Sequence, residues 1–421
     1  MYRYARSGVF ICVLMLILMV STPPLLAQEL RFLAVGWPLA LTEFVNKEVV
    51  PSFEAEHGVK VIINTGANWN NRMDKILVSI AGGVPYDLVC TGFYSPIEEG
   101  SNGLLAPLDD YLANWSSTRK YPEPIWNTLK WQGKTYVVPQ NSALRAIAYN
   151  KALFAQSGLD PEAPPQSWEE LIRYARLLTR MQGDQVTVRG YSSNTGPNAY
   201  SQDLFWYMRQ AGITEFNEAT FTANLTQREA MDAFNTMIEL SDAGRALSPI
   251  LSGGFAGERI AMERQYSGMQ QKAFSQNPNL IPDYGLFLPR KNPTSPPVGH
   301  GFFDGIGILA ASENKDLAWA FIETLYERDT LEQMERISGF ISGNLDLVSR
   351  HVHFMPKIDL FYNAYAYVTN SVIPPPRTTS QTELGKLLEQ AIRKQMSPRE
   401  ALERAQEIWD RLLSEWQATL K

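Results

Sequence analysis

Cysteine and histidine are scarce in this chain, which has 2 cysteines and 4 histidines among 421 residues. Cys12 lies in an N-terminal segment that we expect to be removed, so Cys90 alone remains and no internal disulfide can form. Cys90 ends a predicted strand, where a buried and inert thiol is expected. His351 and His353 alternate without a third ligand at a useful spacing, which predicts a surface pair rather than a metal site. The scarcity of ligating side chains predicts a protein without a metal or another cofactor.

Recognisable catalytic motifs are also absent. The sequence has no Gly-x-Ser-x-Gly elbow for a nucleophile and no Gly-x-x-x-x-Gly-Lys loop for phosphates. The run Gly305-x-Gly307-x-x-Ala310 resembles a dinucleotide fingerprint, but its glycines lead into an apolar strand rather than a helix. We therefore expect a protein that is not an enzyme. Because a carboxylate pair placed for glycoside hydrolysis has no sequence signature, a secreted polysaccharide hydrolase stays as an alternative.

The chain lacks both an excess of basic residues and an apolar run long enough to cross a bilayer. Its formal net charge is −6, so no basic surface attracts nucleic acid and no nucleic-acid partner is expected. The apolar run from Val9 to Val20 is short and follows Arg3 and Arg6, and Leu25-Leu26-Ala27 offers a cleavage site before Gln28. These features predict a signal peptide over residues 1–27 and a periplasmic location, with a membrane anchor as the less favoured alternative.

Strand and helix patterns alternate at the start of the predicted mature chain. Short apolar strands are predicted at Arg31–Val35, Val59–Ile63 and Asp87–Cys90, with amphipathic helices between them. This alternation is typical of a parallel α/β sheet, in which ligands bind past the carboxyl ends of the strands. The sequence therefore predicts an α/β protein with binding loops after these strands.

The segment Gly133–Phe154 carries the most specific pattern. A Gly-Lys turn leads into one strand, a second strand ends at Tyr149–Lys151, and a capped helix begins at Ser167. In this order the segment resembles the first crossing between lobes in the extracellular (periplasmic) solute-binding proteins of ABC importers, closest to family 1, the sugar-binding type. The segment Gly305–Leu325 resembles the return to the first lobe in the same family.

The resemblance implies a type II periplasmic-binding-protein fold of the α/β class. It would have two lobes, each a sheet flanked by helices, with a ligand cleft between them. The first lobe would comprise residues 28–140 and 304–344, and the second lobe residues 141–303 and 345–421. Several passages between lobes would also explain why the sequence has no internal repeat and no long linker.

The resemblance also implies the function. The protein would be the substrate-binding component of an ABC importer that captures a carbohydrate, a mono- or oligosaccharide, by hinge closure. Its partners would be this small-molecule ligand and the transmembrane permease subunits, and it would act as a monomer. Glycerol phosphate, a polyamine or an amino sugar stay open as other ligands. A phosphate would need a basic or backbone N–H nest, for which Arg145 is the one candidate, and a polyamine would need several acids, of which Asp304 is the one candidate.

A sugar site needs aromatic rings and polar side chains in a dry cleft. Loops at predicted strand ends, and the cleft positions that the resemblance implies, give the candidate residues Trp37, Trp69, Phe93, Tyr94, Asn141, Arg145, Tyr200, Tyr266, Phe303, Asp304 and Asn344. Core packing is the alternative for each aromatic residue. It is favoured where aromatics recur at helical spacing, as at Trp206, Tyr207, Trp319 and Trp409. Arg145 could instead form a salt bridge between lobes, and Asp304 could cap a hinge N–H.

Overall fold

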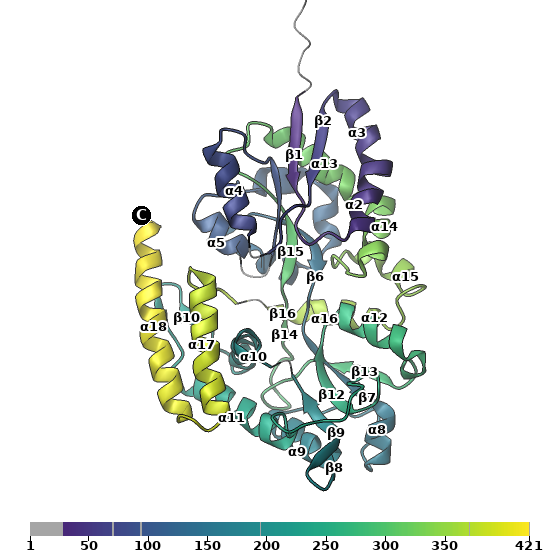
Figure 1. Ribbon diagram of the computed structural model, residues 1–421, viewed down its shortest axis with the longest axis vertical. Coiled ribbons are helices and arrows are strands. Elements are labelled where there is room, and N and C mark those ends of the chain that lie inside the picture. Colours follow the sequence, from purple (N-terminus) through teal and green to yellow (C-terminus); the bar gives the residue numbers. More distant parts are fainter. Residues whose placement is uncertain (1–27, 70, 93–94, 194, 370, 421) are drawn as a thin grey trace, which may run out of the picture.

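The computed structural model describes residues 28–420 apart from 70, 93–94, 194 and 370. The predicted signal peptide therefore lies outside the described residues, and so do the predicted site residues Phe93 and Tyr94. Figure 1 shows two groups of strands and helices, one above the other, joined through strands at the centre of the molecule.

Five strands form the first sheet, in the order β2-β1-β3-β15-β6. Their bounds are β1 Glu29–Leu33, β2 Lys60–Asn64, β3 Leu88–Thr91, β6 Val138–Ser142 and β15 Phe303–Ile308. The predicted parallel arrangement at the start of the chain is confirmed, because β1 pairs in parallel with both β2 and β3. In contrast, β15 is antiparallel to β3 and β6, so a segment from far along the chain completes this sheet.

Helices flank the first sheet in the upper part of Figure 1. They are α2 Leu39–Phe44, α3 Val50–His57, α4 Arg72–Ala81, α5 Ser95–Ser101, α6 Asp109–Asn114, α7 Glu123–Asn127, α13 Lys315–Leu325 and α14 Arg328–Ser338. A short hairpin, β4 Lys130–Trp131 and β5 Lys134–Thr135, precedes β6. Gly58 ends α3 in the left-handed conformation with φ 67°, which a side chain would disfavour.

The second sheet has the order β13-β7-β12-β9-β8. Its strands are β7 Ala146–Asn150, β8 Arg180–Gln182, β9 Gln185–Ser192, β12 Ile260–Gln265 and β13 Tyr284–Phe287. The remaining helices are α8 Lys151–Gln156, α9 Trp168–Leu178, α10 Pro197–Gln210, α11 Arg228–Ala243, α12 Ser267–Gln276, α15 Val348–His351, α16 Asp359–Ala364, α17 Arg377–Ile392 and α18 Pro398–Thr419. The yellow pair α17 and α18 lies beside α10, and a small hairpin, β10 Phe216–Asn217 and β11 Thr222–Ala223, lies next to α18 (Figure 1).

Two connections between the sheets lie side by side. Residues 143–145 alone separate β6 from β7, whereas residues 288–302 separate β13 from β15 and include β14 Gly299–His300. The backbone N–H of Ala143 donates to the carbonyl oxygen of Phe302 at 2.8 Å, and that of Arg145 donates to His300 at 2.7 Å. β14 also pairs in parallel with β16 Val368–Thr369. The lobe boundaries stay a prediction.

Local signals in the sequence place several elements correctly. The Ser167 Oγ accepts the N–H of Glu170 at 3.1 Å at the start of α9, and Ser397 does the same for Glu400 in α18. The aromatic residues assigned to the core are confirmed there, with exposed fractions of 8% or less: Trp206, Tyr207, Trp319 and Trp409.

The cysteine prediction is confirmed, and one histidine prediction is wrong. Cys90 is buried, and burial raises the pKa of its thiol. His351 is also fully buried rather than on the surface: its Nε2 lies 2.9 Å from Glu335 Oε2, and its Nδ1 lies 2.8 Å from the Tyr362 hydroxyl. The residues that bury the imidazole come from elsewhere in the sequence, so the spacing of the two histidines could not predict this burial. His353 is exposed.

Within the residues that the structure describes, no three His, Cys, Asp or Glu side chains lie close enough to hold a metal ion. Nor is any described helix both long and apolar enough to cross a membrane.

Candidate ligand-binding site

A cavity of about 770 Å³ lies where the first crossing enters the second sheet. Its volume is in the range of sites that hold small ligands. The lining comes from the crossing, from β12, from the loop and first turns of α10, and from α17: Arg145, Thr195, Gly196, Pro197, Asn198, Ala199, Gln202, Arg264 and Thr382. Among the residues predicted from sequence, Arg145 is in this lining.

The crossing positions Arg145 at one side of the cavity. Its backbone is fixed to the second crossing through His300. Its guanidinium lies over the ring of Tyr266, 4.7 Å from the centroid, and 5.5 Å from that of Phe302. Such cation–π contacts hold a cation in place while leaving it charged. The structure thus brings together two predicted residues, Arg145 and Tyr266. The Tyr266 ring is also stacked parallel to that of Phe340.

Arg264, on β12, forms a second cationic part of the lining. Its Nη1 lies 2.6 Å from the Oδ1 of Asp203 on α10, and both side chains are almost completely buried. Asp203 also accepts a hydrogen bond from the Ser193 hydroxyl. Burial raises the pKa of the Asp203 carboxyl, although Arg264, Ser193 and Arg145 act in the opposite direction. This pair holds β12 and α10 together behind the cavity.

The first turn of α10 faces the same cavity. Gly196 is its N-cap, has φ 105°, and offers no side chain to accept the first N–H groups of the helix. Pro197 in this turn has no N–H, and the N–H groups of Ala199 and Tyr200 donate to the Gly196 carbonyl oxygen, each at 3.0 Å. α17 packs tightly here, since a Cβ on Gly385 would lie 1.9 Å from the carbonyl oxygen of Pro197. The glycine allows two helices to meet at the cavity wall.

Two predicted polar residues lie together at the edge of the first sheet. Asn141 on β6 is the register partner of Asp304 on β15, and both are partly exposed. The Asp304 carboxylate lies against Gly92, where an added Cβ would come within 2.0 Å of its Oδ1. This edge therefore offers an amide and a carboxylate near the point where the chain leaves the first sheet.

The two predicted tryptophans of the first lobe differ in accessibility. Trp37 is 8% exposed, its Nε1 donates to Gln140 Oε1 at 3.2 Å, and its ring packs edge-on against Phe32. Trp69 is only partly buried, and its ring lies so close to Gly36 that a Cβ there would approach it to 3.0 Å. Trp69 consequently has more accessible ring surface for a ligand than Trp37.

Three other predicted residues are covered by protein. Tyr200 is 7% exposed and faces a small cavity of about 40 Å³ that Asp203 also lines. Phe303 is fully buried, and the side chain of Asn344 accepts the N–H of Asp346 at 3.0 Å. None of the three is in the lining of the large cavity.

Sequence reasoning missed most of the cavity lining. Arg264 lies in β12, and a single arginine in a strand carries no sequence signal for a binding site. Gln202 and Thr382 are polar residues of helices, and helical polar residues are usually solvent-facing.

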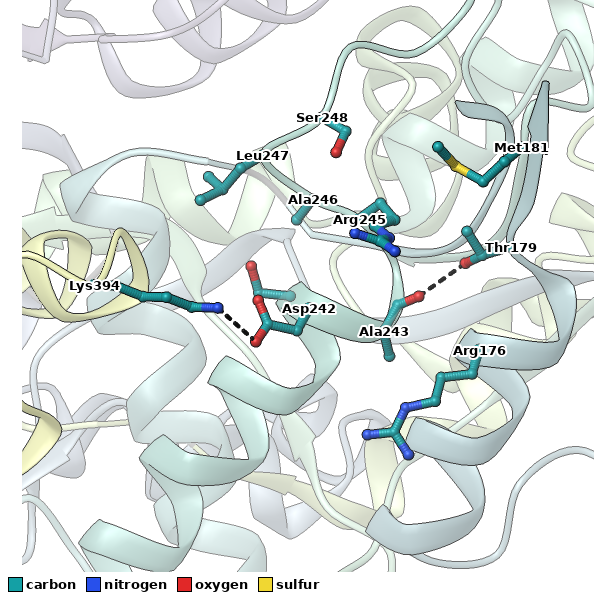
Figure 2. Close-up of a pocket in the computed structure, with 11 residues that line it drawn as sticks. Arg176, Thr179, Met181, Asp242, Ala243, Arg245, Ala246, Leu247, Ser248 and Lys394 are labelled. Atoms are coloured by element: carbon teal, nitrogen blue, oxygen red, sulfur yellow. Dashed lines mark hydrogen bonds and ion pairs between the residues drawn. The ribbon is translucent and has the colours of Figure 1, made fainter. Parts of the chain in front are cut away.

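A second cavity of about 530 Å³ lies elsewhere, near the C-terminal ends of α9 and α11. Figure 2 shows Lys394 pointing toward Asp242, at 3.4 Å, and Thr179 donating to the Ala243 carbonyl oxygen at 3.0 Å. Its lining includes none of the residues predicted from sequence and no residue of the crossings. The cavity at Arg145 is therefore the better candidate.

Comparisons with known proteins agree with this architecture. The family model described as "Bacterial extracellular solute-binding protein" matches residues 37–330. A putative binding protein of Brucella abortus is 24% identical over 306 residues, which are 71% of this chain and 72% of the relative. The sn-glycerol-3-phosphate-binding periplasmic protein UgpB of Escherichia coli is 48% identical over only 40 residues, 10% of this chain and 9% of UgpB.

A solved structure extends the likeness to almost the whole chain. The sugar-binding protein MalE of Xanthomonas citri superposes with a TM-score of 0.78 at 18% identity, covering 93% of this chain and 98% of that protein. The similarity confirms the fold class predicted from the sequence, an α/β periplasmic-binding-protein fold with two lobes, each a sheet flanked by helices.

Proposed function

This chain belongs to the family of bacterial extracellular solute-binding proteins, and we propose that it captures a carbohydrate between its lobes for an ABC importer. The family consists of binding proteins, so the chain is not an enzyme and the hydrolase alternative falls away. The proposal adds the ligand class, a mono- or oligosaccharide, delivery to the transmembrane permease subunits, a monomeric state and a periplasmic location.

The observation that carries the proposal is the cavity of about 770 Å³ beside the first crossing. Its lining has polar side chains suited to hydroxyl groups, such as Gln202 and Thr382, and the aromatic ring of Tyr266 packs against the lining residue Arg145. The similarity to a sugar-binding protein over nearly the full chain supports the same ligand class.

Hinge closure is the proposed mechanism. The first crossing has only residues 143–145, and it is hydrogen-bonded to the second crossing at Ala143 and Arg145, so few residues of the first crossing can take up a rotation of the lobes. A ligand shifts the open–closed equilibrium only by its preference for the closed state. The cavity residues and the first-sheet edge at Asn141 and Asp304 would supply that preference by contacting the ligand from two sides.

A thermal-shift screen with mono- and oligosaccharides tests the ligand class. A ligand at a hundred times its Kd stabilises the folded protein by about 2.7 kcal/mol, which raises Tm measurably. We expect at least one carbohydrate to do so. A Tm increase with spermidine, and with none of the carbohydrates, would contradict the proposal.

A phosphorylated polyol is the second candidate, favoured by the short match to the glycerol-phosphate-binding protein. The polyamine alternative has less support, because the described cavity lining contains two arginines and no carboxylate.

A further inference from the structure

A cluster of four aromatic rings joins the C-terminal helix to the hairpin that precedes β6. Trp131 on β4 stacks on Trp416 of α18, with ring centroids 4.8 Å apart and planes 29° apart. Both side chains are buried, with exposed fractions of 4% and 2%. Phe216 and Phe221 of the hairpin β10–β11 pack edge-on against Trp416, at 6.1 and 5.6 Å between centroids. We call these four residues the aromatic clasp.

The clasp connects the part of the molecule built on the first sheet with the part built on the second. Its β4–β5 hairpin belongs to the first part, because the N–H of Leu108 donates to the Thr135 carbonyl oxygen at 2.8 Å. α18 packs on α17 and α11 of the second part. Gln406 and Asp410 of α18 also hold the β10–β11 hairpin, through hydrogen bonds of 2.7 Å each to the backbone of Ala223. Figure 1 shows the yellow α18 running up to the level of the first part.

The crossings lie between the large cavity and the clasp. Arg145 lines the cavity, and its N–H donates to the His300 carbonyl oxygen at 2.7 Å. The His300 Nε2 lies 3.0 Å from the Ser371 hydroxyl oxygen, and this hydroxyl donates to Glu215 Oε1 at 2.7 Å. Glu215 directly precedes Phe216 of the clasp. A chain of contacts therefore runs from the cavity, across the crossings, to the clasp.

The course of α10 gives the same order. The helix begins at Pro197 in the cavity lining and ends at Gln210, before the clasp residue Phe216. Between these ends, Trp206 donates through its Nε1 to the carbonyl oxygen of Val298, in the second crossing, at 2.7 Å. A rotation about the crossings that narrows the cavity must therefore widen the gap at the clasp, on the other side of the pivot.

The clasp is a contact that can part. The Nε1–H of the buried Trp416 has no hydrogen-bond acceptor among the described residues, which offsets some of the gain from its ring contacts. Beside the clasp a cavity of about 350 Å³ separates the two parts, and its lining includes Lys130 from the first part and Glu218 from the second. Phe221 has φ 52°, a left-handed conformation that is rare for an aromatic residue and typical of functional positions.

We infer that the aromatic clasp stabilises the open arrangement of the lobes and thereby lowers the affinity for the cargo without touching it. This inference rests on the proposed hinge closure. In the described arrangement the clasp is formed, and the cavity lining contains neither Asn141 nor Asp304 of the first-sheet edge. A ligand that closes the lobes has to separate the rings, so its apparent Kd rises as the closed fraction falls. Trp131 and Trp416 are thus positioning residues that act through the lobes.

Two variants remove the stack from opposite sides. Trp131→Leu and Trp416→Leu each keep an apolar side chain but lose the ring. The matched control is Trp319→Leu, because Trp319 stacks on Tyr111 within the first part, at 5.0 Å between centroids and 17° between planes. All three variants should lower Tm, but only the first two should change the arrangement of the lobes.

Distances between the lobes test this without a ligand. Nitroxide labels are placed on Glu43→Cys in α2 and Lys272→Cys in α12, both exposed positions, and the buried Cys90 stays unlabelled. We expect either clasp variant to raise the share of a second label distance about three- to tenfold, the effect of one aromatic pair. The double variant should add little to either single one, because both remove the same contact. Unchanged distances in the clasp variants, or the same change in Trp319→Leu, would refute the inference.

Affinity is the second measurement, by titration calorimetry with maltose, mannobiose and glycerol 3-phosphate. Any of these that binds the natural sequence should bind Trp131→Leu and Trp416→Leu about three- to tenfold more tightly, and Trp319→Leu within twofold. Equal or weaker binding to the clasp variants would overturn the inference and leave the carbohydrate proposal standing. If no carbohydrate binds here or in the thermal screen, the carbohydrate proposal fails and the label distances decide the role of the clasp.

Discussion

Replacing Arg264 with methionine tests how the wall of the cavity is held together. The variant keeps a long apolar stem but leaves the buried Asp203 carboxylate without the cation now 2.6 Å away. Removing one partner of a buried ion pair costs about 3–5 kcal/mol of folding free energy. Ser193 still donates a hydrogen bond to Asp203, so we expect a loss near the lower limit, about 3 kcal/mol, at pH 7.5.

The loss should depend on pH, and its sign follows from the carboxyl group. Burial already raises the pKa of Asp203 in the folded protein, and removal of Arg264 raises it further. A carboxyl whose pKa is higher in the folded state binds more protons folded than unfolded, so stability increases as pH falls toward its unfolded pKa of about 3.9. Below the folded pKa the gain approaches about 1.4 kcal/mol per pH unit. The variant should therefore lose less stability at pH 5.5 than at pH 7.5.

Urea unfolding at the two pH values measures both effects, with the slope m as a check that the same surface unfolds. The control is Arg264→Met combined with Asp203→Asn, which removes both charges and should recover most of the stability. A loss below about 1 kcal/mol at pH 7.5, or an equal loss at both pH values, would refute the idea that this pair is a charged and desolvated contact.

Two further predictions concern the first lobe. Trp69→Ala should weaken ligand binding by about 1 kcal/mol, roughly fivefold, with little change in Tm, because its ring is partly exposed. Trp37→Ala should instead cost about 3–5 kcal/mol of stability, because its ring is packed in the core. Calorimetric titration measures the loss of affinity and urea unfolding the loss of stability, and the reverse pattern would exchange the roles of the two residues. Gly92→Ala should displace Asp304, since the new Cβ would lie 2.0 Å from its Oδ1, and weaken binding in the same titration; unchanged affinity would mean that the Asp304 carboxylate does not contact the ligand.

The parts of the fold that depend on neighbouring residues could be predicted from the sequence. Short apolar runs locate β1, β2 and β3, and the serine caps at Ser167 and Ser397 locate the starts of two helices. These signals arise from contacts within a few residues, so each survives in any tertiary context. Adding β15 to the N-terminal sheet depends on the family resemblance, because no local pattern specifies a partner more than two hundred residues away.

The candidate site was predictable only in part, for the same reason. Arg145 and Asp304 lie at strand ends near the crossings, where sequence reasoning can look for a ligand. Arg264 on β12 is held at the cavity by an ion pair with Asp203 on α10, and the sequence does not show that these two residues are neighbours. The uncapped first turn of α10 becomes part of a cavity only because Gly385 lets α17 approach it. The position of Arg264 beside Arg145 in the cavity lining is therefore visible in the structure and not in the sequence.

Arg145 lies both in the cavity lining and in the first connection between the two sheets. Its backbone N–H is held by the His300 carbonyl oxygen at 2.7 Å, and His300 in turn pairs with β16 and places its Nε2 3.0 Å from the Ser371 hydroxyl oxygen. The first crossing, β14 and β16 thus meet beside this residue. Because a ligand drives closure only through interactions that differ between open and closed states, a ligand that contacts Arg145 would act directly on a segment that joins the two sheets.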